Sequence, residues 1–201
     1  MALPTTLRSA RFLFDLRRED LPSPSGFTYQ AGGSIVVANA FFPRGLATID
    51  LATGQHRDRL VFFGPPGGAV GAAGPFDADH YVVSHRAGGG PAEQTRLHLV
   101  NRAGVPHGDP DFAHYLGGVY DGVIELSEAK GGAQVQVFPT PAGPRILTGS
   151  KVFDLAGNLT HRFDEAALGM VDGLGGVVWI GGNRFAALDG DTSVVTVFHT
   201  P

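Results

Sequence analysis

One pattern recurs along the sequence: short apolar runs are separated by turns that begin with Asp or Asn and contain a nearby Gly. The clearest copy occupies residues 169–198, and paler copies precede it. The residues that begin the turns are Asp50, Asn101, Asp154 and Asp189. Asp and Asn side chains accept hydrogen bonds from the following backbone, and Gly tolerates positive φ, so both favour tight turns between strands. The repetition predicts a protein built from several similar β units.

The distances between these turns indicate one β architecture. Successive turn residues lie 51, 53 and 35 positions apart, and a truncated copy at Asp15 precedes Asp50 by 35. These intervals bracket the period of about 40 to 50 residues that four-stranded propeller blades show. We therefore predict an all-β fold, a small β-propeller of about four to five four-stranded blades over residues 27–201. A β-sandwich or open barrel with long loops is the alternative, because strand patterns alone do not separate these folds.

Each repeat contains a segment of small residues that suits the crowded centre of a ring. We predict the innermost strands of the blades at 26–30, 68–73, 118–126 and 169–174. Two of these segments share an Asp-Gly step, at Asp121 and Asp172, which lie 51 residues apart.

Residues 1–26 are predicted to form an N-terminal strand and a Pro-rich linker. In the segment 10–16, Phe12, Phe14 and Leu16 alternate with Arg11, Leu13 and Asp15, as expected of a strand. A helix over 6–21 is the alternative. The strand could join the blade built by the C-terminus and close the ring, which would remove an exposed sheet edge. A small ring closed without it, or two chains forming a larger ring, would also fit the pattern.

Composition excludes several classes of function. A net charge of −4, with 15 Lys and Arg residues spread along the chain, provides no basic patch for nucleic acid. The absence of cysteine excludes disulfides, zinc–thiolate sites and a cysteine nucleophile. No segment resembles a signal peptide or the run of about 20 apolar residues that spans a membrane. We expect a soluble protein, cytoplasmic or part of a larger particle.

Three segments resemble the blades of known propeller families. They are 49–54, 76–83 and 172–180, and they are similar to repeats of the quinoprotein, surface-layer and gluconolactonase-like families. The gluconolactonase-like resemblance implies a metal-dependent hydrolase of lactones or esters, with a divalent metal held at the mouth of the channel. Asp121 and Asp172 are the residues onto which its metal ligands carry over, and carboxylates there suit Ca²⁺. The alternative is that both are turn-forming residues before Gly.

A compact polar loop is the second candidate metal site. It contains His107, Asp109, Asp111 and His114. Imidazole and carboxylate groups at these spacings could bind a transition metal or act as an acid–base pair. A solvated loop is the alternative, since no closed metal-binding motif such as HExxH is present.

Aromatic residues indicate a binding role. Phe41 and Phe42, and likewise Phe62 and Phe63, are consecutive, so in a strand one member of each pair would face the core and its neighbour a contact surface. Burial of both members between stacked sheets is the alternative. Tyr120 completes the candidate binding set. Trp179, the only tryptophan, is expected to pack between blades.

These observations predict a non-enzymatic binding or assembly module. It would contact a protein partner, a ligand or a second copy of itself through long loops at 64–73, 85–95 and 105–117. The rival predictions are a Ca²⁺-dependent lactonase or esterase and a structural component of a larger particle. No cofactor other than Ca²⁺ is expected.

Overall fold

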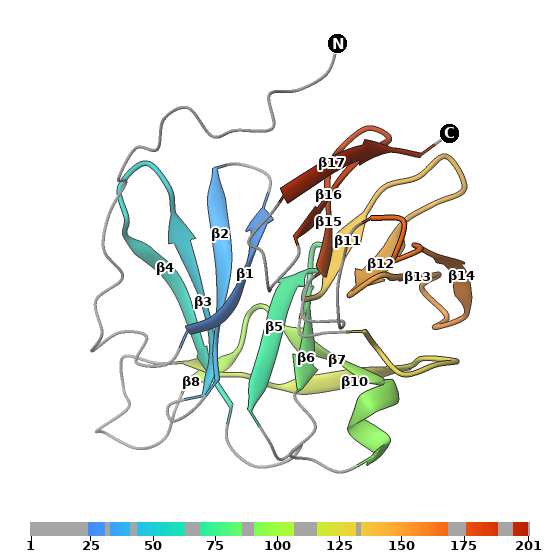
Figure 1. Cartoon of the computed structure of the whole chain (residues 1–201). Helices are drawn as coiled ribbons and strands as arrows, with labels where there is room; N and C mark the ends of the chain where they lie inside the picture. The colour runs from blue at the N-terminus through green and yellow to red at the C-terminus, as the bar shows by residue number, and fades with distance from the viewer. Residues whose placement is uncertain are drawn as a thin grey trace.

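Four small sheets are arranged in a ring and form a four-bladed β-propeller (Figure 1). The computed structural model describes residues 24–30, 33–40, 44–62, 69–85, 91–106, 116–131, 134–168, 176–188 and 195–200. The fold class predicted from the repeats is therefore confirmed, with four blades.

Blades 1 and 2 come from the first two thirds of the described chain. The strands of blade 1 are β1 (Pro24–Gln30), β2 (Ser34–Asn39), β3 (Gly45–Asp50) and β4 (His56–Val61), extended by β9 (Leu116–Gly117) and β8 (Val105–Pro106). The strands of blade 2 are β5 (Val70–Pro75), β6 (His80–His85), β7 (Arg96–Asn101) and β10 (Tyr120–Glu125). A short 3-10 helix, η2 (Pro91–Thr95), precedes β7.

Blades 3 and 4 are formed by consecutive strands. Blade 3 contains β11 (Gln136–Phe138), β12 (Arg145–Thr148), β13 (Lys151–Phe153) and β14 (Leu159–Arg162). Blade 4 contains β15 (Gly176–Gly181), β16 (Arg184–Leu188) and β17 (Val195–His199). Within the described residues, blade 4 thus has three strands where blade 3 has four.

The turns between strands use the predicted chemistry. Asp50 Oδ1 accepts hydrogen bonds from the amides of Ala52 and Thr53, and Asp154 Oδ1 accepts one from Ala156. Asn101 makes the same kind of turn. The fourth predicted turn residue, Asp189, lies outside the described residues.

Glycine residues let the innermost strands approach each other closely at two points. β1 lies against β5, where a side chain at Gly26 would come within 3.2 Å of the Gly71 carbonyl oxygen. A side chain at Gly74 would come within 3.0 Å of the Val135 carbonyl oxygen. Innermost strands at 26–30 and 68–73 were predicted on this ground, and β1 and β5 occupy these places.

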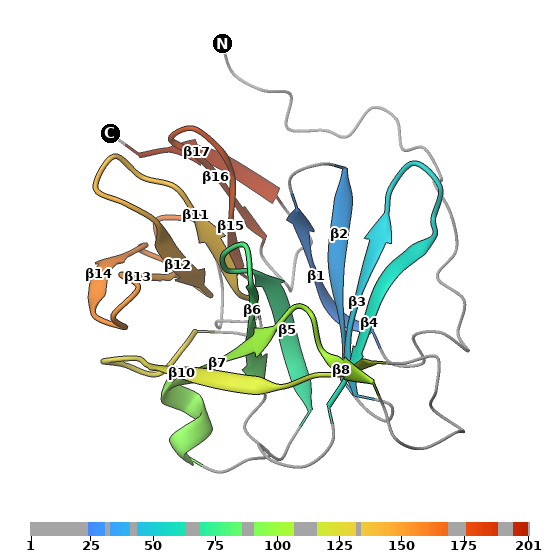
Figure 2. The same cartoon turned by 180° about the vertical axis from the view of Figure 1, so that it is seen from behind.

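The prediction for residues 118–126 was wrong. This segment contains β10, which is the outermost strand of blade 2 and pairs with β7. After β7 the chain leaves blade 2, adds β8 and β9 to the edge of blade 1, and returns as β10 (Figure 2). The small residue Gly118 is needed because Phe62 packs over it, and not because it lies at the centre. The innermost strand of blade 3 is β11, and the segment 169–174 lies outside the described residues.

Three hydrophobic cores fill the three interfaces between blades that follow each other in the chain. Between blades 1 and 2 the core includes Val36, Leu60, Val70 and Tyr81. Between blades 2 and 3 it includes Val82, Leu97, Ile146 and Phe153. Between blades 3 and 4 it includes Phe138, Leu147, Val177 and Phe185. No core cluster of the described residues joins blade 4 to blade 1, so this interface differs from the others.

Candidate functional site

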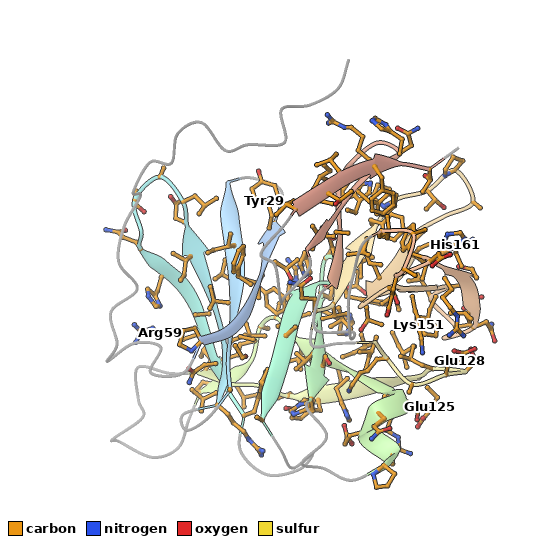
Figure 3. All side chains as sticks on the ribbon, in the orientation of Figure 1. Tyr29, Arg59, Glu125, Glu128, Lys151 and His161 are labelled. Atoms are coloured by element: carbon orange, nitrogen blue, oxygen red, sulfur yellow. The ribbon has the colours of Figure 1, made fainter. Side chains whose placement is uncertain are left out.

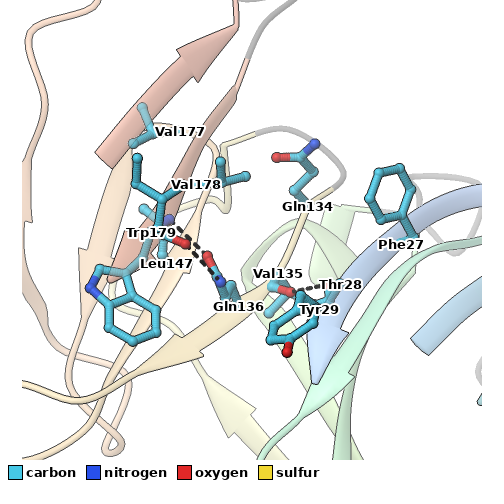
Figure 4. Close-up of a pocket in the computed structure, with 11 residues that line it drawn as sticks. Phe27, Thr28, Tyr29, Gln134, Val135, Gln136, Leu147, Val177, Val178 and Trp179 are labelled. Atoms are coloured by element: carbon cyan, nitrogen blue, oxygen red, sulfur yellow. Dashed lines mark hydrogen bonds between the residues drawn. The ribbon is translucent and has the colours of Figure 1, made fainter. Parts of the chain in front are cut away.

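A cavity of about 190 Å³ is lined mainly by the innermost strands of blades 4, 3 and 1, and we call it the seam cavity (Figure 4). Its walls come from β1, from β15 and from the segment that leads into β11. The lining residues are Phe27, Thr28, Tyr29, Gln134, Val135, Gln136, Leu147, Val177, Val178, Trp179 and Ile180. Strands β1 and β15 thus both line the cavity, whereas β1 packs directly on β5.

The wall that β1 contributes is aromatic and exposed. Phe27 is 71% exposed and Tyr29 is 59% exposed, while Thr28 between them is buried. Figure 3 shows the Tyr29 side chain at the end of β1. This alternation follows from the strand, whose successive side chains point to opposite faces. The Thr28 hydroxyl donates to the Val135 carbonyl oxygen at 3.2 Å and ties β1 to the start of blade 3. The strand that carries the two aromatic rings is thus anchored on its other face.

The opposite wall is held in place by a side chain from blade 3. The Trp179 amide donates to Gln136 Oε1 at 2.8 Å, and Gln136 Nε2 donates to the Trp179 carbonyl oxygen at 3.2 Å. The Trp179 indole stacks on Phe138 with ring centroids 6.0 Å apart, and its Nε1 donates to the Gly182 carbonyl oxygen. Trp179 therefore packs between blades 3 and 4, as predicted. These contacts attach β15 to blade 3.

The chemistry of the seam cavity is apolar with a small polar part. The described lining residues include no Asp, Glu, Lys, Arg or His, and their polar side-chain groups are the amides of Gln134 and Gln136, the hydroxyls of Thr28 and Tyr29 and the indole N–H of Trp179. Because Gln136 is already paired with the backbone of Trp179, Gln134 is the amide that stands at the wall in Figure 4. Such a cavity suits an uncharged, largely apolar group.

Asp121 lies elsewhere, on the outer strand of blade 2. It is the extra residue of a β-bulge, because Tyr120 pairs with Val100 while Gly122 pairs with Leu99. Bulges redirect side chains, and here Asp121 Oδ2 accepts from His80 Nε2 at 3.1 Å. His80 Nδ1 donates in turn to Asp77 at 2.9 Å. His80 therefore links two carboxylates at the surface.

The two carboxylates change the protonation of His80. The hydrogen bond with Asp77 raises the pKa of His80 above its ordinary value, and the charges of Asp121 and Asp77 add to this effect, although desolvation opposes it. For Asp77, desolvation raises the pKa. Hydrogen bonds from the His80 ring and from the Asp79 and His80 amides outweigh it and lower the pKa on balance. The cluster therefore favours an imidazolium between two carboxylates, which is a charged tie between β6 and β10.

The described surroundings of Asp121 do not fit a Ca²⁺ site. Its close polar partners are nitrogen donors, His80 Nε2 and Asn101 Nδ2, whereas Ca²⁺ is held by six to eight oxygen atoms. The Asn101 side-chain oxygen accepts from the Ala103 amide. Within the described ranges, no group of three or more His, Cys, Asp or Glu side chains could hold a metal.

Several predicted site residues lie outside the described residues. They are Asp172, His107, Asp109, Asp111, His114, Phe41, Phe42 and Phe63. The second Asp-Gly step and the polar loop therefore stay predictions.

The other two predicted binding residues lie inside the molecule. Phe62 is buried in the core between blades 1 and 2, and its ring centroid is 5.1 Å from that of Tyr120. The Tyr120 hydroxyl hydrogen-bonds His85 Nε2 at 3.0 Å, and burial raises the pKa of Tyr120. Phe62 is thus the core member of its aromatic pair.

A buried hydrogen bond between side chains adjoins these rings. His98 Nε2 lies 2.9 Å from Glu93 Oε2, and both side chains are almost fully buried. The His98 ring meets the His85 ring edge-on, with centroids 5.3 Å apart. The pair connects η2 to β7 and stabilises the end of blade 2 where Tyr120 also lies.

Sequence reasoning missed Phe27 and Tyr29. The signal was present, because the predicted innermost strand 26–30 contains two large aromatic residues, whereas the predicted innermost strand 68–73 contains only Gly, Ala and Val. Large aromatic side chains on the innermost strand of a small propeller are unexpected unless they face a cavity.

Comparison with known protein families and curated proteins identified no relative of this chain. No family model matches the chain, and none of the curated proteins matches it. Among the described residues, no helix is long and apolar enough to cross a membrane.

Proposed function

We propose that this propeller is a protein-binding module whose partner inserts an aromatic side chain into the seam cavity. The observation that supports the proposal is the contrast between the interfaces of the ring. Three interfaces are filled by hydrophobic cores, and the fourth has a cavity with exposed aromatic walls. Exposed large apolar groups that gather around a cavity are typical of interaction sites.

The size and charge of the cavity determine the kind of occupant. Its volume of about 190 Å³ is below the roughly 300–1,000 Å³ of sites that enclose a whole small-molecule ligand. One inserted ring fits this volume better than a cofactor does. The absence of charge on the lining side chains favours an uncharged group, and the Gln134 amide can bind a polar atom at its edge.

The long loops stay a second predicted contact surface. Of the segments 64–73, 85–95 and 105–117, the structure describes 69–73, 85, 91–95, 105–106 and 116–117. A partner that uses these loops would contact blades 1 and 2.

A free ring compound provides the first test. Indole is titrated into the isotope-labelled chain, and NMR shifts of Phe27, Tyr29 and Ile180 are followed. We expect saturable binding that Val178→Trp weakens by more than about tenfold, because the new indole ring fills the cavity. The matched control is Val123→Trp, which places the same ring on exposed β10, away from the cavity. Equal binding by the Val178→Trp variant would contradict the site.

Selected peptides provide the second test, which concerns the protein partner itself. A random peptide library displayed on phage is screened against the wild-type chain and against the Val178→Trp variant. We expect the wild-type chain to enrich peptides with an aromatic residue, and indole to displace them. Peptides that bind both chains equally would place the contact elsewhere.

The gluconolactonase-like resemblance supports a rival function, Ca²⁺-dependent hydrolysis of lactones or esters. It rests on Asp121 and Asp172, of which Asp121 is committed to His80 and Asn101. Lactone turnover that requires Ca²⁺ and is lost in the Asp121→Asn variant would favour this rival over the binding module.

A further inference from the structure

The chain contains two lysines, Lys130 and Lys151, and their amines lie in different surroundings. Lys151 Nζ lies 3.4 Å from the Glu128 carboxylate and donates to the Ala129 carbonyl oxygen at 2.7 Å. Figure 3 shows Lys151 beside Glu128. A carboxylate at this distance stabilises the charged ammonium. Lys151 is thus an ion-paired lysine.

Lys130 is half-buried and has an uncharged partner instead. Its Nζ donates to the Arg96 carbonyl oxygen at 3.0 Å. Its backbone amide donates to the Gln94 carbonyl oxygen at 2.7 Å, which fixes this part of the chain against η2. An ammonium has three N–H donors, and a single acceptor among the described residues, a neutral carbonyl, receives one of them. Burial beside a neutral acceptor favours the uncharged amine.

The charged and titratable side chains on η2 and β7, the elements that Lys130 contacts, are engaged with other partners. Glu93 of η2 is hydrogen-bonded to His98 of β7 at 2.9 Å. Arg96 of β7 is ion-paired with Glu125 of β10 at 2.7 Å. Among the described residues, no carboxylate therefore forms an ion pair with Lys130, in contrast to Lys151.

These surroundings change the protonation of Lys130. Burial lowers the pKa of Lys130 to about 8, and the charge of Glu93 only partly opposes this shift. An ordinary lysine amine has a pKa of about 10.4. Near pH 7.5 about a quarter of the Lys130 amines are then uncharged, compared with about one in a thousand ordinary lysine amines. The uncharged amine carries the lone pair that attacks a carbonyl compound.

We propose that Lys130 is a reactive amine that forms an imine with small aldehydes. The Nζ lone pair attacks the carbonyl carbon, the π electrons of the C=O bond move to oxygen, and a proton passes from nitrogen to this oxygen. The carbinolamine then loses water and leaves a C=N bond to Lys130. One amine and one aldehyde give one imine and one water, so the reaction needs no oxidant or reductant. The aldehyde must be small, because Lys130 is half-buried.

Reductive trapping of the imine tests the proposal. The full-length chain is incubated near pH 7.5 with propanal and cyanoborohydride, which reduces the imine to a stable secondary amine, and peptide mass spectrometry locates the labelled lysines. We expect Lys130 to be labelled more than about tenfold faster than Lys151. Lys130→Arg should keep only the slow label on Lys151. In urea, where burial is lost, the two lysines of the wild-type chain should be labelled at similar rates.

A second variant tests the surroundings of the amine. Because the charge of Glu93 raises the pKa of Lys130, Glu93→Gln should lower the pH at which Lys130 labelling is half-maximal. Unfolding would shift this pH in the opposite direction, toward that of an ordinary lysine. Glu128→Gln removes the carboxylate partner of Lys151 and is the matched control, which should leave the pH profile of Lys130 unchanged.

Three results would overturn the proposal. Equal labelling of Lys130 and Lys151 in the folded chain would show that Lys130 is an ordinary amine. A folded chain in which Lys130 takes no label would show that aldehydes do not reach it. If Glu93→Gln does not fold, the wild-type pH profile decides. The labelling rate of Lys130 should level off above about pH 9, and a rate that still rises beyond about pH 10 contradicts the reactive amine.

Discussion

At the residue scale, Asp121 connects β10 to β6 through its hydrogen bond with His80. A bulge in β10 turns its carboxylate toward His80, which also bonds Asp77. The sequence signal, Asp before Gly, is the same whether the residue forms a turn, binds a metal or binds a histidine. Only its neighbours distinguish these roles, and they come from another strand.

The histidine tie predicts a specific pH dependence of stability. Because the folded-state pKa of His80 is raised above 6.5, its contribution is complete below pH 6.5 and is lost as the pH rises through the raised value. Because the pKa of Asp77 is lowered from 3.8, the contribution of Asp77 is lost as the pH falls below that value. The tie is therefore strongest between these limits.

The measurement is urea unfolding of the wild-type chain and of the Asp121→Asn variant across this range. We expect the difference in unfolding free energy to be largest near pH 6 and to shrink above the pKa of His80. Glu125→Gln, on the same strand but paired with Arg96, is the control for a general loss of charge. A difference that does not change with pH would contradict the assignment.

At the scale of elements, glycine allows two strands of blade 1 to pair closely. A side chain at Gly45 on β3 would collide with the backbone carbonyl oxygen of Leu60 on β4. The strand cannot move away, because Leu46 and Leu60 belong to the core between blades 1 and 2. Gly45 is thus required by strand packing and not by a turn.

Substitution of this glycine should destabilise the protein strongly. We expect Gly45→Ala to cost about 3 kcal/mol, because rigid backbone atoms collide. Gly33→Ala is the comparison, since Gly33 has a φ of 80° but no atom within 4 Å of the new side chain. It should cost only about 1 kcal/mol of backbone strain. Thermal or urea unfolding of both variants measures the difference, and equal losses would contradict the packing argument.

At the scale of the whole molecule, the ring is packed unevenly. Hydrophobic cores join blades 1 to 2, 2 to 3 and 3 to 4, while blades 4 and 1 face each other across the seam cavity. Large apolar residues therefore have two different roles. Those at the first three interfaces stabilise the fold, and we propose that those lining the seam cavity bind a partner.

Two identical substitutions distinguish these roles. Phe153 is fully buried between blades 2 and 3, so Phe153→Ala should lower the free energy of unfolding by about 3–5 kcal/mol. Phe27 is largely exposed at the seam cavity, so Phe27→Ala should lower the free energy of unfolding by less than about 0.5 kcal/mol. Urea unfolding measures both values. A large loss in the Phe27→Ala variant would mean that the seam is part of the core and would also weaken the proposed binding site.

The sequence by itself determined the local features of this protein. Asp50, Asn101 and Asp154 form turns through their own neighbouring backbone, so their chemistry is visible without the fold. The repeats and small inner segments likewise identified a propeller and the places of β1 and β5. Each of these features depends on contacts that are close in the sequence or on a pattern that repeats.

The tertiary structure decided which strands pair and where the seam cavity lies. After β7 the chain passes along the edge of blade 1 as β8 and β9 before β10 pairs with β7 in blade 2. No local sequence pattern indicates this path. The seam cavity brings Phe27 and Tyr29 on β1 to the same space as residues of β15, about 150 residues later in the chain. A cavity is a property of distant surfaces that fail to meet, so it cannot be read from either segment alone.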